Sequence, residues 1–100
     1  MTSDEAVTLL VTMQAVAGSG NRLQDELASV AALSRADAGC IRYDVLVDLQ
    51  GDDRFVLWEE WLDDVSLDDH NTKPHVARFR EVSAALLAVP MDVQRLRRSA

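Results

Sequence analysis

One segment in the middle of the chain holds most of the side chains that could carry out chemistry. Glu59 and Trp61 are followed by the only two histidines, His70 and His75, and all five aromatic residues lie within positions 43–79 of the 100-residue sequence. A histidine titrates near neutral pH, so it can accept or donate a proton, and aromatic rings can hold a flat substrate. We therefore expect a small pocket lined by imidazole and aromatic groups.

The surroundings of Glu59 leave two interpretations open. Strand alternation would place Glu59 and Trp61 on one buried face, where a carboxylate needs a hydrogen-bond donor, and His70 is the nearest candidate in the sequence. In the functional interpretation, Trp61, Phe79 and Tyr43 sandwich a flat aromatic substrate while a histidine transfers a proton. In the structural interpretation, His70 bonds to Glu59 and holds the preceding loop on the sheet, and the aromatic rings are core packing.

His75 would lie in the first turn of a helix that begins at Pro74, where a solvated or pocket-rim position is favoured over catalysis. With His70 and Glu59 it would complete a two-histidine, one-carboxylate set of the kind that binds iron. The two histidines are five residues apart, about 140° around a continuous helix, so their ligand atoms need not converge. We therefore predict no metal site.

The charge of the chain limits its partners. It has 10 Lys and Arg against 17 Asp and Glu, which gives a net charge of −7. Such a chain repels phosphate backbones and anionic lipids, which argues against nucleic acid or a membrane surface as a partner. The C-terminal arginines Arg95, Arg97 and Arg98 are interpreted as a solvated terminus.

The single cysteine and the apolar segments are typical of a cytoplasmic protein. Cys40 cannot form an internal disulfide, no Cys/His spacing suits a structural zinc, and its place at the start of a strand favours a small buried hydrophobe over a nucleophile. No apolar run approaches the ~20 residues of a membrane helix, and the N-terminus is acidic where a signal peptide is basic. We expect a cytoplasmic location.

Hydrophobic periodicity predicts four strands and two helices. Apolar residues alternate along the strands and recur at i, i+4 and i+7 in the helices. Residues 62–69 have turn chemistry, with one helical turn capped by Asp64 or Ser66. The predicted strands span 7–15, 41–49, 54–61 and 91–96, and the predicted helices span 21–35, followed by Gly39, and 74–87, stopped by Val89-Pro90.

This β-α-β-β-α-β order predicts an α+β fold, the split βαβ pattern of a ferredoxin-like domain that comprises residues 1–100. Its antiparallel sheet would carry both helices on one face, so the other face needs a cover. Strands 7–15 and 54–61 offer bulky apolar residues on both faces, and Trp58 points away from Trp61. We predict a homodimer in which the helix-free faces pack together, with Trp58 at the interface.

Three segments give the chain its resemblance to a known family. They are Gly39-Cys40-Ile41-Arg42-Tyr43, Glu59-Glu60-Trp61, and the run from Leu67 to His75 that leads to Phe79. With these residues the chain resembles the antibiotic biosynthesis monooxygenase family of dimeric α+β barrel proteins, which includes small quinol monooxygenases and anthrone oxygenases. The spacing from Trp61 to His70 to His75 is the specific part of the match.

The resemblance implies a homodimer whose subunits each hold a hydrophobic pocket between sheet and helices. Members that are oxygenases often work without metal or flavin, since a deprotonated quinol or anthrone can itself reduce dioxygen. The function implied is a cofactor-independent monooxygenase that acts on a quinol- or anthrone-type aromatic substrate, with dioxygen as co-substrate. By the resemblance, Glu59, Trp61, His70 and His75 are catalytic, and Tyr43, Phe79 and Asn71 bind the substrate.

Other functions stay open beside this one. Haem-degrading relatives use an asparagine on the first strand and a histidine later in the second helix, and this chain has neither. The domain could instead be a non-catalytic dimeric module that binds a hydrophobic metabolite. It could also be a cofactor-free isomerase or hydrolase with His70 or His75 as its general base.

Overall fold

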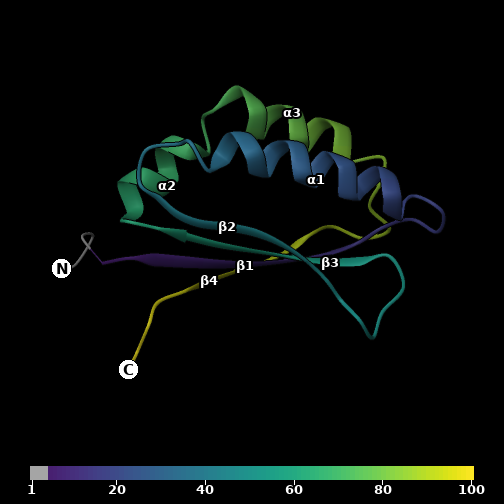
Figure 1. The fold of residues 1–100 in the computed structure, drawn as a ribbon, viewed down its shortest axis with the longest axis horizontal. Helices are drawn as coiled ribbons and strands as arrows, with labels where there is room; N and C mark the ends of the chain where they lie inside the picture. The colour runs from purple at the N-terminus through teal and green to yellow at the C-terminus, as the bar shows by residue number, and fades with distance from the viewer. Residues whose placement is uncertain (1–4) are drawn as a thin grey trace.

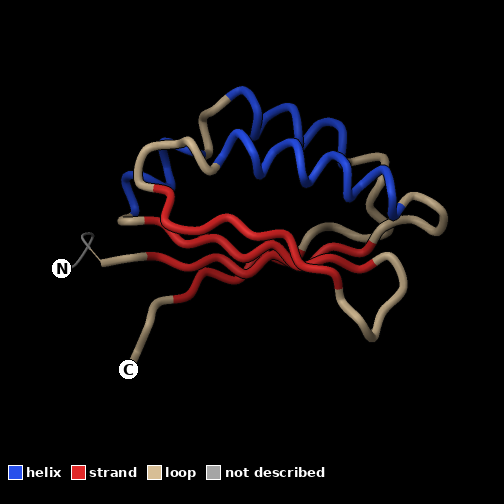
Figure 2. Tube along the Cα trace, viewed as in Figure 1, coloured by secondary structure: helices blue, strands red, loops and turns tan. Residues whose placement is uncertain are grey.

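The computed structural model describes residues 5–100, in which four strands form one sheet and three helices cover one of its faces (Figure 1). The sheet is antiparallel in the order β2-β3-β1-β4. Figure 2 shows its strands as one layer beneath the helices. The strands are β1 (Val7–Gln14), β2 (Cys40–Val47), β3 (Arg54–Trp61) and β4 (Asp92–Leu96), and the helices are α1 (Gly20–Ser34), α2 (Asp64–His70) and α3 (Pro74–Ser83). The predicted ferredoxin-like α+β fold is confirmed, with one more helix than expected.

The core lies between the sheet and the helices. Alternate residues of β1 point into it, as the period-2 pattern predicted, and α1 contributes the stripe expected of an amphipathic helix. Trp61, at the end of β3, is completely buried. The side chains that form this layer from β1 and α1 are Val7, Leu9, Val11, Met13, Leu23, Leu27, Val30 and Ala31.

Strand β2 departs from simple alternation. Cys40 pairs with Trp61 and Arg42 pairs with Glu60, so β2 advances by two residues where β3 advances by one. This β-bulge lets Cys40 and Tyr43, three residues apart, both face the core. The prediction that Ile41 shares a face with Tyr43 is wrong, because Ile41 is the extra residue and its side chain is exposed.

The segment between β3 and β4 contains two short helices. Asp63, rather than the predicted Asp64 or Ser66, caps α2: its carboxylate accepts a hydrogen bond of 2.8 Å from the backbone N–H of Ser66. Helix α3 ends at Ser83, four residues before the predicted end. The chain leaves the helix there because its backbone pairs with the end of β1, where Ala88 N–H donates to the Gln14 carbonyl at 2.8 Å.

The face of the sheet without helices carries apolar side chains that the chain itself leaves uncovered. Trp58, Leu46 and Leu96 are 38%, 45% and 45% exposed, and Leu10 pairs with Trp58 across β1 and β3. The guanidinium of Arg42 lies 5.3 Å from the centre of the Trp58 ring. Between residues 5 and 100, no helix has both the length and the hydropathy to span a bilayer.

Candidate active site

A cavity of about 180 Å³ lies between the sheet and the α2–α3 segment. Most of its wall is apolar and comes from β1, β3, α3, β4 and the residue before β4: Leu9, Val11, Leu57, Val76, Phe79, Val93 and Met91. Its polar wall consists of Tyr43, Glu59, His70, Asn71 and Arg80. A small apolar hollow with a few convergent polar groups has the composition of a ligand site.

Asp37 connects the two histidines. Its Oδ2 atom lies 2.8 Å from Nδ1 of His70 and 2.9 Å from Nε2 of His75. His70 is the last residue of α2, and His75 is the second residue of α3. The break between the two helices at Pro74 thus turns both imidazoles toward one carboxylate oxygen, with ring centres 6.0 Å apart. The spacing of the two histidines did not require their ligand atoms to converge, but in the structure they do.

The loop between α1 and β2 holds Asp37 in place. The Asp37 N–H donates to the Ser34 carbonyl at 3.0 Å, and its carbonyl accepts from the Cys40 N–H at 3.1 Å. Gly39, in the left-handed region with φ of 82°, lets the chain enter β2 here, and its carbonyl accepts from Leu62 N–H at 2.8 Å. Gly39 therefore lies in the turn just before β2. The prediction placed it directly after the first helix, but α1 already ends at Ser34.

The electrostatics of Asp37 determine how His70 is protonated. Burial alone would raise the pKa of Asp37, but the hydrogen bonds from His70 and His75 more than offset this effect and hold it below its usual value. An ionised carboxylate can only accept, so both imidazoles donate an N–H to it. Burial lowers the pKa of His70, which favours its neutral form. Neutral His70 then carries its proton on Nδ1 and its free lone pair on Nε2.

Glu59 lies beside that lone pair. Its Oε1 is 3.9 Å from His70 Nε2, too long for a hydrogen bond, and it accepts one of 2.9 Å from the indole N–H of Trp61. The structural interpretation in which His70 bonds to Glu59 is therefore wrong: the donor is Trp61, and the partner of His70 is Asp37. Burial raises the pKa of Glu59 to about 7, although the Trp61 hydrogen bond acts in the opposite direction.

Two aromatic rings pack near the His70 side chain. The centre of the Trp61 ring is 4.3 Å from that of His70, and the Tyr43 ring is 5.6 Å away. Burial, and next the nearby charge of Glu59, raise the pKa of the Tyr43 hydroxyl, so it stays neutral. Cys40 is half-buried against the core and burial raises the pKa of its thiol, as suits a small hydrophobe.

The predicted site residues divide into two groups in the structure. Glu59, His70, Tyr43, Phe79 and Asn71 line the cavity. The other two predicted site residues, Trp61 and His75, are not part of the cavity wall. Trp61 contacts Glu59 and His70 from behind the wall, and His75 contacts Asp37.

Sequence reasoning missed two polar residues of the site, Asp37 and Arg80. The guanidinium of Arg80 lies at the cavity and donates long hydrogen bonds of 3.5 and 3.3 Å to the backbone and side-chain oxygens of Asn71. Arg80 could have been proposed from the sequence, because it directly follows Phe79, a predicted pocket residue, on a predicted helix. Asp37 had no such signal, because it lies in a loop between two alanines.

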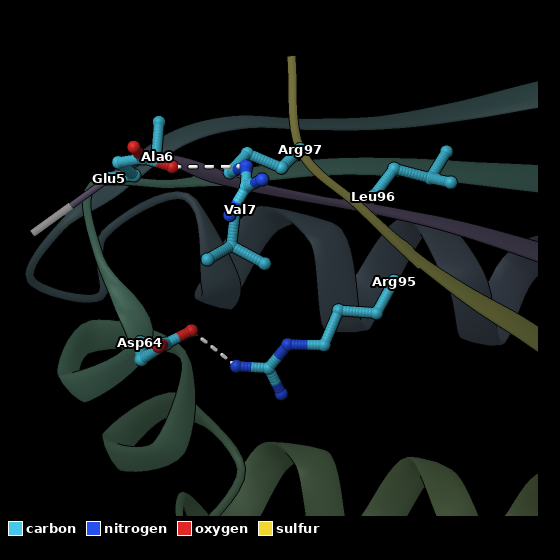
Figure 3. A pocket seen from close by; sticks show the side chains of 7 residues that line it. All are labelled: Glu5, Ala6, Val7, Asp64, Arg95, Leu96 and Arg97. Atoms are coloured by element: carbon cyan, nitrogen blue, oxygen red, sulfur yellow. Dashed lines mark hydrogen bonds and ion pairs between the residues drawn. The ribbon is translucent and has the colours of Figure 1, made fainter. Parts of the chain in front are cut away.

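A second hollow, of about 320 Å³, lies beside the ends of β1 and β4 and contains none of the predicted site residues (Figure 3). Its two arginines are paired with carboxylates of the same chain, Arg95 with Asp64 and Arg97 with Glu5. Both arginine side chains are more than half exposed. Ion pairs this exposed contribute little binding energy, so the chemistry of this chain is better sought in the smaller cavity.

Known proteins resemble this chain in sequence and in fold. Residues 6–82 match the sequence model of a family described as antibiotic biosynthesis monooxygenase. Over 70 residues, which are 70% of this chain and 74% of its relative, the sequence is 33% identical to YcnE of Bacillus subtilis (strain 168), described as a candidate monooxygenase. The crystal structure of PA3566 from Pseudomonas aeruginosa superimposes with a TM-score of 0.90, at 34% identity and with 100% of both chains covered. The structure of Rv0793 from Mycobacterium tuberculosis has a TM-score of 0.91 at 25% identity, and 96% of this chain and 97% of that chain are covered.

Proposed function

Because the chain belongs to the antibiotic biosynthesis monooxygenase family, we propose that it is a cofactor-independent monooxygenase that acts on a small quinol-type aromatic substrate, with dioxygen as co-substrate. The observation that carries this proposal is the position of His70. It lines an apolar cavity on one side and is held by the Asp37 carboxylate on the other. A histidine oriented by a carboxylate is the arrangement of a general base.

The size of the cavity narrows the substrate class. Its volume of about 180 Å³ lies below the roughly 300–1,000 Å³ of pockets that hold drug-sized ligands. A quinol with one or two rings suits this space better than a three-ring anthrone. Phe79 and Val76 from α3 and Leu57 from β3 supply the apolar walls against which such rings pack.

His70 takes the proton of the substrate in this proposal. Its Nε2 lone pair accepts the hydroxyl proton, and Asp37 stabilises the imidazolium that forms through the Nδ1 hydrogen bond. Glu59, whose pKa burial raises to about 7, lies 3.9 Å from Nε2 and could take over that proton only after a side-chain movement that shortens this distance. The positive charge of Arg80 stabilises the resulting phenolate.

The deprotonated ring then supplies the electrons for oxygenation. Its electron pair reduces dioxygen, which bonds to a ring carbon and, with a proton, forms a hydroperoxide. Loss of water from that carbon leaves a carbonyl group, so one oxygen atom enters the product and the other leaves as water. The protein binds the substrate, excludes water and removes the proton, and the substrate itself is the reductant.

Oxygen uptake by the purified protein with a panel of quinols and anthrones tests the proposal. We expect turnover with the smaller quinols, and a rate lower by about 10²–10⁴-fold in His70→Gln, which keeps a donor for Asp37 but has no base. The absence of uptake with every compound, or equal uptake in the variant, would refute it. Turnover in anaerobic buffer would indicate the isomerase or hydrolase alternative, and saturable binding without product would indicate a binding module.

We also propose that the protein is a homodimer, joined through the helix-free face of the sheet. That face exposes Trp58, Leu46 and Leu96, apolar groups of the kind that form the buried centre of an interface. A second copy would cover them by a two-fold contact in which each sheet packs on the other.

A further inference from the structure

Behind His70, on the side of its ring away from Glu59, we infer a binding site for a divalent transition-metal ion formed by Asp37, His70 and His75. One ligand atom of each residue lies within 4.8 Å of the ligand atoms of the other two. The three residues come from the α1–β2 loop, the end of α2 and the start of α3, so a bound ion would join all three segments.

The distances are close to those of a coordination sphere. Zinc binds nitrogen and oxygen ligands at about 2.0–2.2 Å, so two ligands of a tetrahedral ion are roughly 3.4 Å apart. The Asp37 oxygen lies 2.8 Å from the His70 nitrogen and 2.9 Å from the His75 nitrogen. Each gap needs to widen by roughly 0.5 Å to admit the ion, a movement that small rotations of the side chains can supply.

The donor set selects the class of ion. Two imidazole nitrogens and one carboxylate oxygen suit Zn²⁺, Fe²⁺ or Co²⁺, whereas Mg²⁺ and Ca²⁺ prefer oxygen ligands throughout. The side chains of Asp37 and His75 are 10% and 15% exposed, which gives the ion a route from solvent and leaves a further position for water. Glu59, 3.9 Å from the far nitrogen of His70, lies on the side where an outer carboxylate often orients a metal-binding histidine, although the distance must shorten before a hydrogen bond forms.

Occupation of the site would reverse the protonation of His70. A metal ion on Nδ1 takes the lone pair of that nitrogen, so the single proton of the neutral ring moves to Nε2. Nε2 then becomes a donor toward Glu59 and cannot accept a proton from a substrate. If the proposed function holds, on which this step alone rests, Zn²⁺ would therefore inhibit oxygenation.

Titration of chelator-treated protein with Co²⁺, followed by its visible absorption, tests the site directly. We expect saturable binding of one ion per chain. The affinity should fall by more than about 100-fold in His75→Gln and in Asp37→Asn, which is beyond the 10–100-fold typical of an outer-shell change. His75→Gln is the more informative variant, because Gln at this partly exposed position retains a hydrogen-bond donor for Asp37.

Asp25→Asn is the matched control, since Asp25 is an exposed carboxylate in α1, on the helix side of the sheet and outside the three ligand residues. It should bind Co²⁺ as the wild type does, and Mg²⁺ should not compete with Co²⁺. The inference is overturned if Co²⁺ does not bind saturably, or if it binds His75→Gln as tightly as the wild type. Because the absorption of Co²⁺ needs no turnover, a protein that binds the ion but never consumes oxygen would refute the proposed function alone.

Discussion

Asp37, a loop residue, accepts hydrogen bonds from two imidazoles with one oxygen atom. Both contacts are short, at 2.8 and 2.9 Å, and the His70 side chain is 3% exposed. A buried N–H that loses its acceptor costs the free energy needed to remove that group from water. The carboxylate therefore matters for stability as well as for the orientation of His70.

Replacement of Asp37 by Asn should lower the free energy of unfolding by about 1–3 kcal/mol, because a neutral amide oxygen is a weaker acceptor for the two imidazole N–H groups than the ionised carboxylate oxygen. Urea unfolding at neutral pH measures the change. Asp25→Asn, at an exposed position of α1, should change it by less than about 0.5 kcal/mol. Equal effects of the two substitutions would show that the Asp37 contacts contribute no stability.

The raised pKa of Glu59 predicts a dependence of stability on pH. The unfolded chain releases this proton near pH 4.5, whereas the folded chain keeps it up to about pH 7. Between these values the native state binds the extra proton, so the free energy of unfolding falls as the pH rises, by roughly 3 kcal/mol in total.

Glu59→Gln isolates this effect, since the amide oxygen can still accept the Trp61 N–H but does not titrate. The variant should gain stability relative to the wild type as the pH is raised from about 5 to about 8, which denaturant unfolding at each pH would reveal. A difference between the two proteins that does not vary with pH would mean that Glu59 ionises as an exposed carboxylate does.

At this scale the sequence identified the histidines but not the carboxylate that they share. His70, Glu59, Tyr43 and Phe79 were accessible to prediction because rare residue types cluster in one segment. Asp37 lies 33 residues before His70, in a loop without periodicity. Its contact with the histidines exists only because the break before α3 turns His75 back toward α1, and no local pattern encodes that angle.

Among the elements, the short loop from α1 to β2 tolerates the fewest changes of residue type, because Gly39 combines a positive φ with a close contact to α2. Gly39 has a φ of 82°, and a Cβ atom at this position would overlap the hydroxyl and Cβ of Ser66 in α2. The close approach lets the loop that carries Asp37 pack against the helix that carries His70. A side chain at Gly39 would therefore separate the two partners as well as strain the backbone.

Gly39→Ala should destabilise the protein by at least about 1 kcal/mol more than Gly18→Ala. Gly18 is the matched control, because its φ is 86° but nothing lies within 4 Å of the added Cβ. Both variants incur the backbone strain, and only Gly39→Ala adds the steric overlap. Thermal or urea unfolding of the two variants measures the difference. Equal losses of stability would mean that α2 moves away from the added Cβ atom without a cost in free energy.

Periodicity predicted the strands and long helices well and their ends less well. The end of α3 was placed too late because Leu86 and Leu87 fit the helical spacing, yet the structure uses this segment to pair with the end of β1. The sequence pattern did not predict the β-bulge at Ile41 for a similar reason. Its apolar side chain fits the alternation of β2, and only the pairing with β3 shows that it is an extra residue.

The molecule as a whole has one covered and one uncovered sheet face. Helices bury one side of β1 and β3, while Trp58 and its apolar neighbours remain exposed on the other. The alternation of large residues on both faces of β3 made this asymmetry predictable from the sequence. We propose that a second copy of the chain covers the other face in solution.

Substitution of Trp58 by Glu should convert the dimer to a monomer, because it removes a large apolar side chain and places a charge at the centre of the interface. Light scattering at micromolar concentration measures the mass. Leu33→Glu is the control: Leu33 is 53% exposed on α1, on the helix side of the sheet, and should leave the dimer intact. A monomeric wild-type protein, or dimeric Trp58→Glu, would contradict the proposed interface.

Helix α3 has a consequence for how this protein could diversify. Three of its side chains in the cavity wall, Val76, Phe79 and Arg80, are spaced as one helical face, while the proton-transfer groups Glu59 and His70 come from β3 and α2. The apolar side chains of α3 that contact a ligand thus lie on a different piece of the chain from the proton acceptor. Exchange of Val76 and Phe79, with His75 and Arg80 of the same helix retained, could give a set of proteins with altered selectivity and an unchanged reaction.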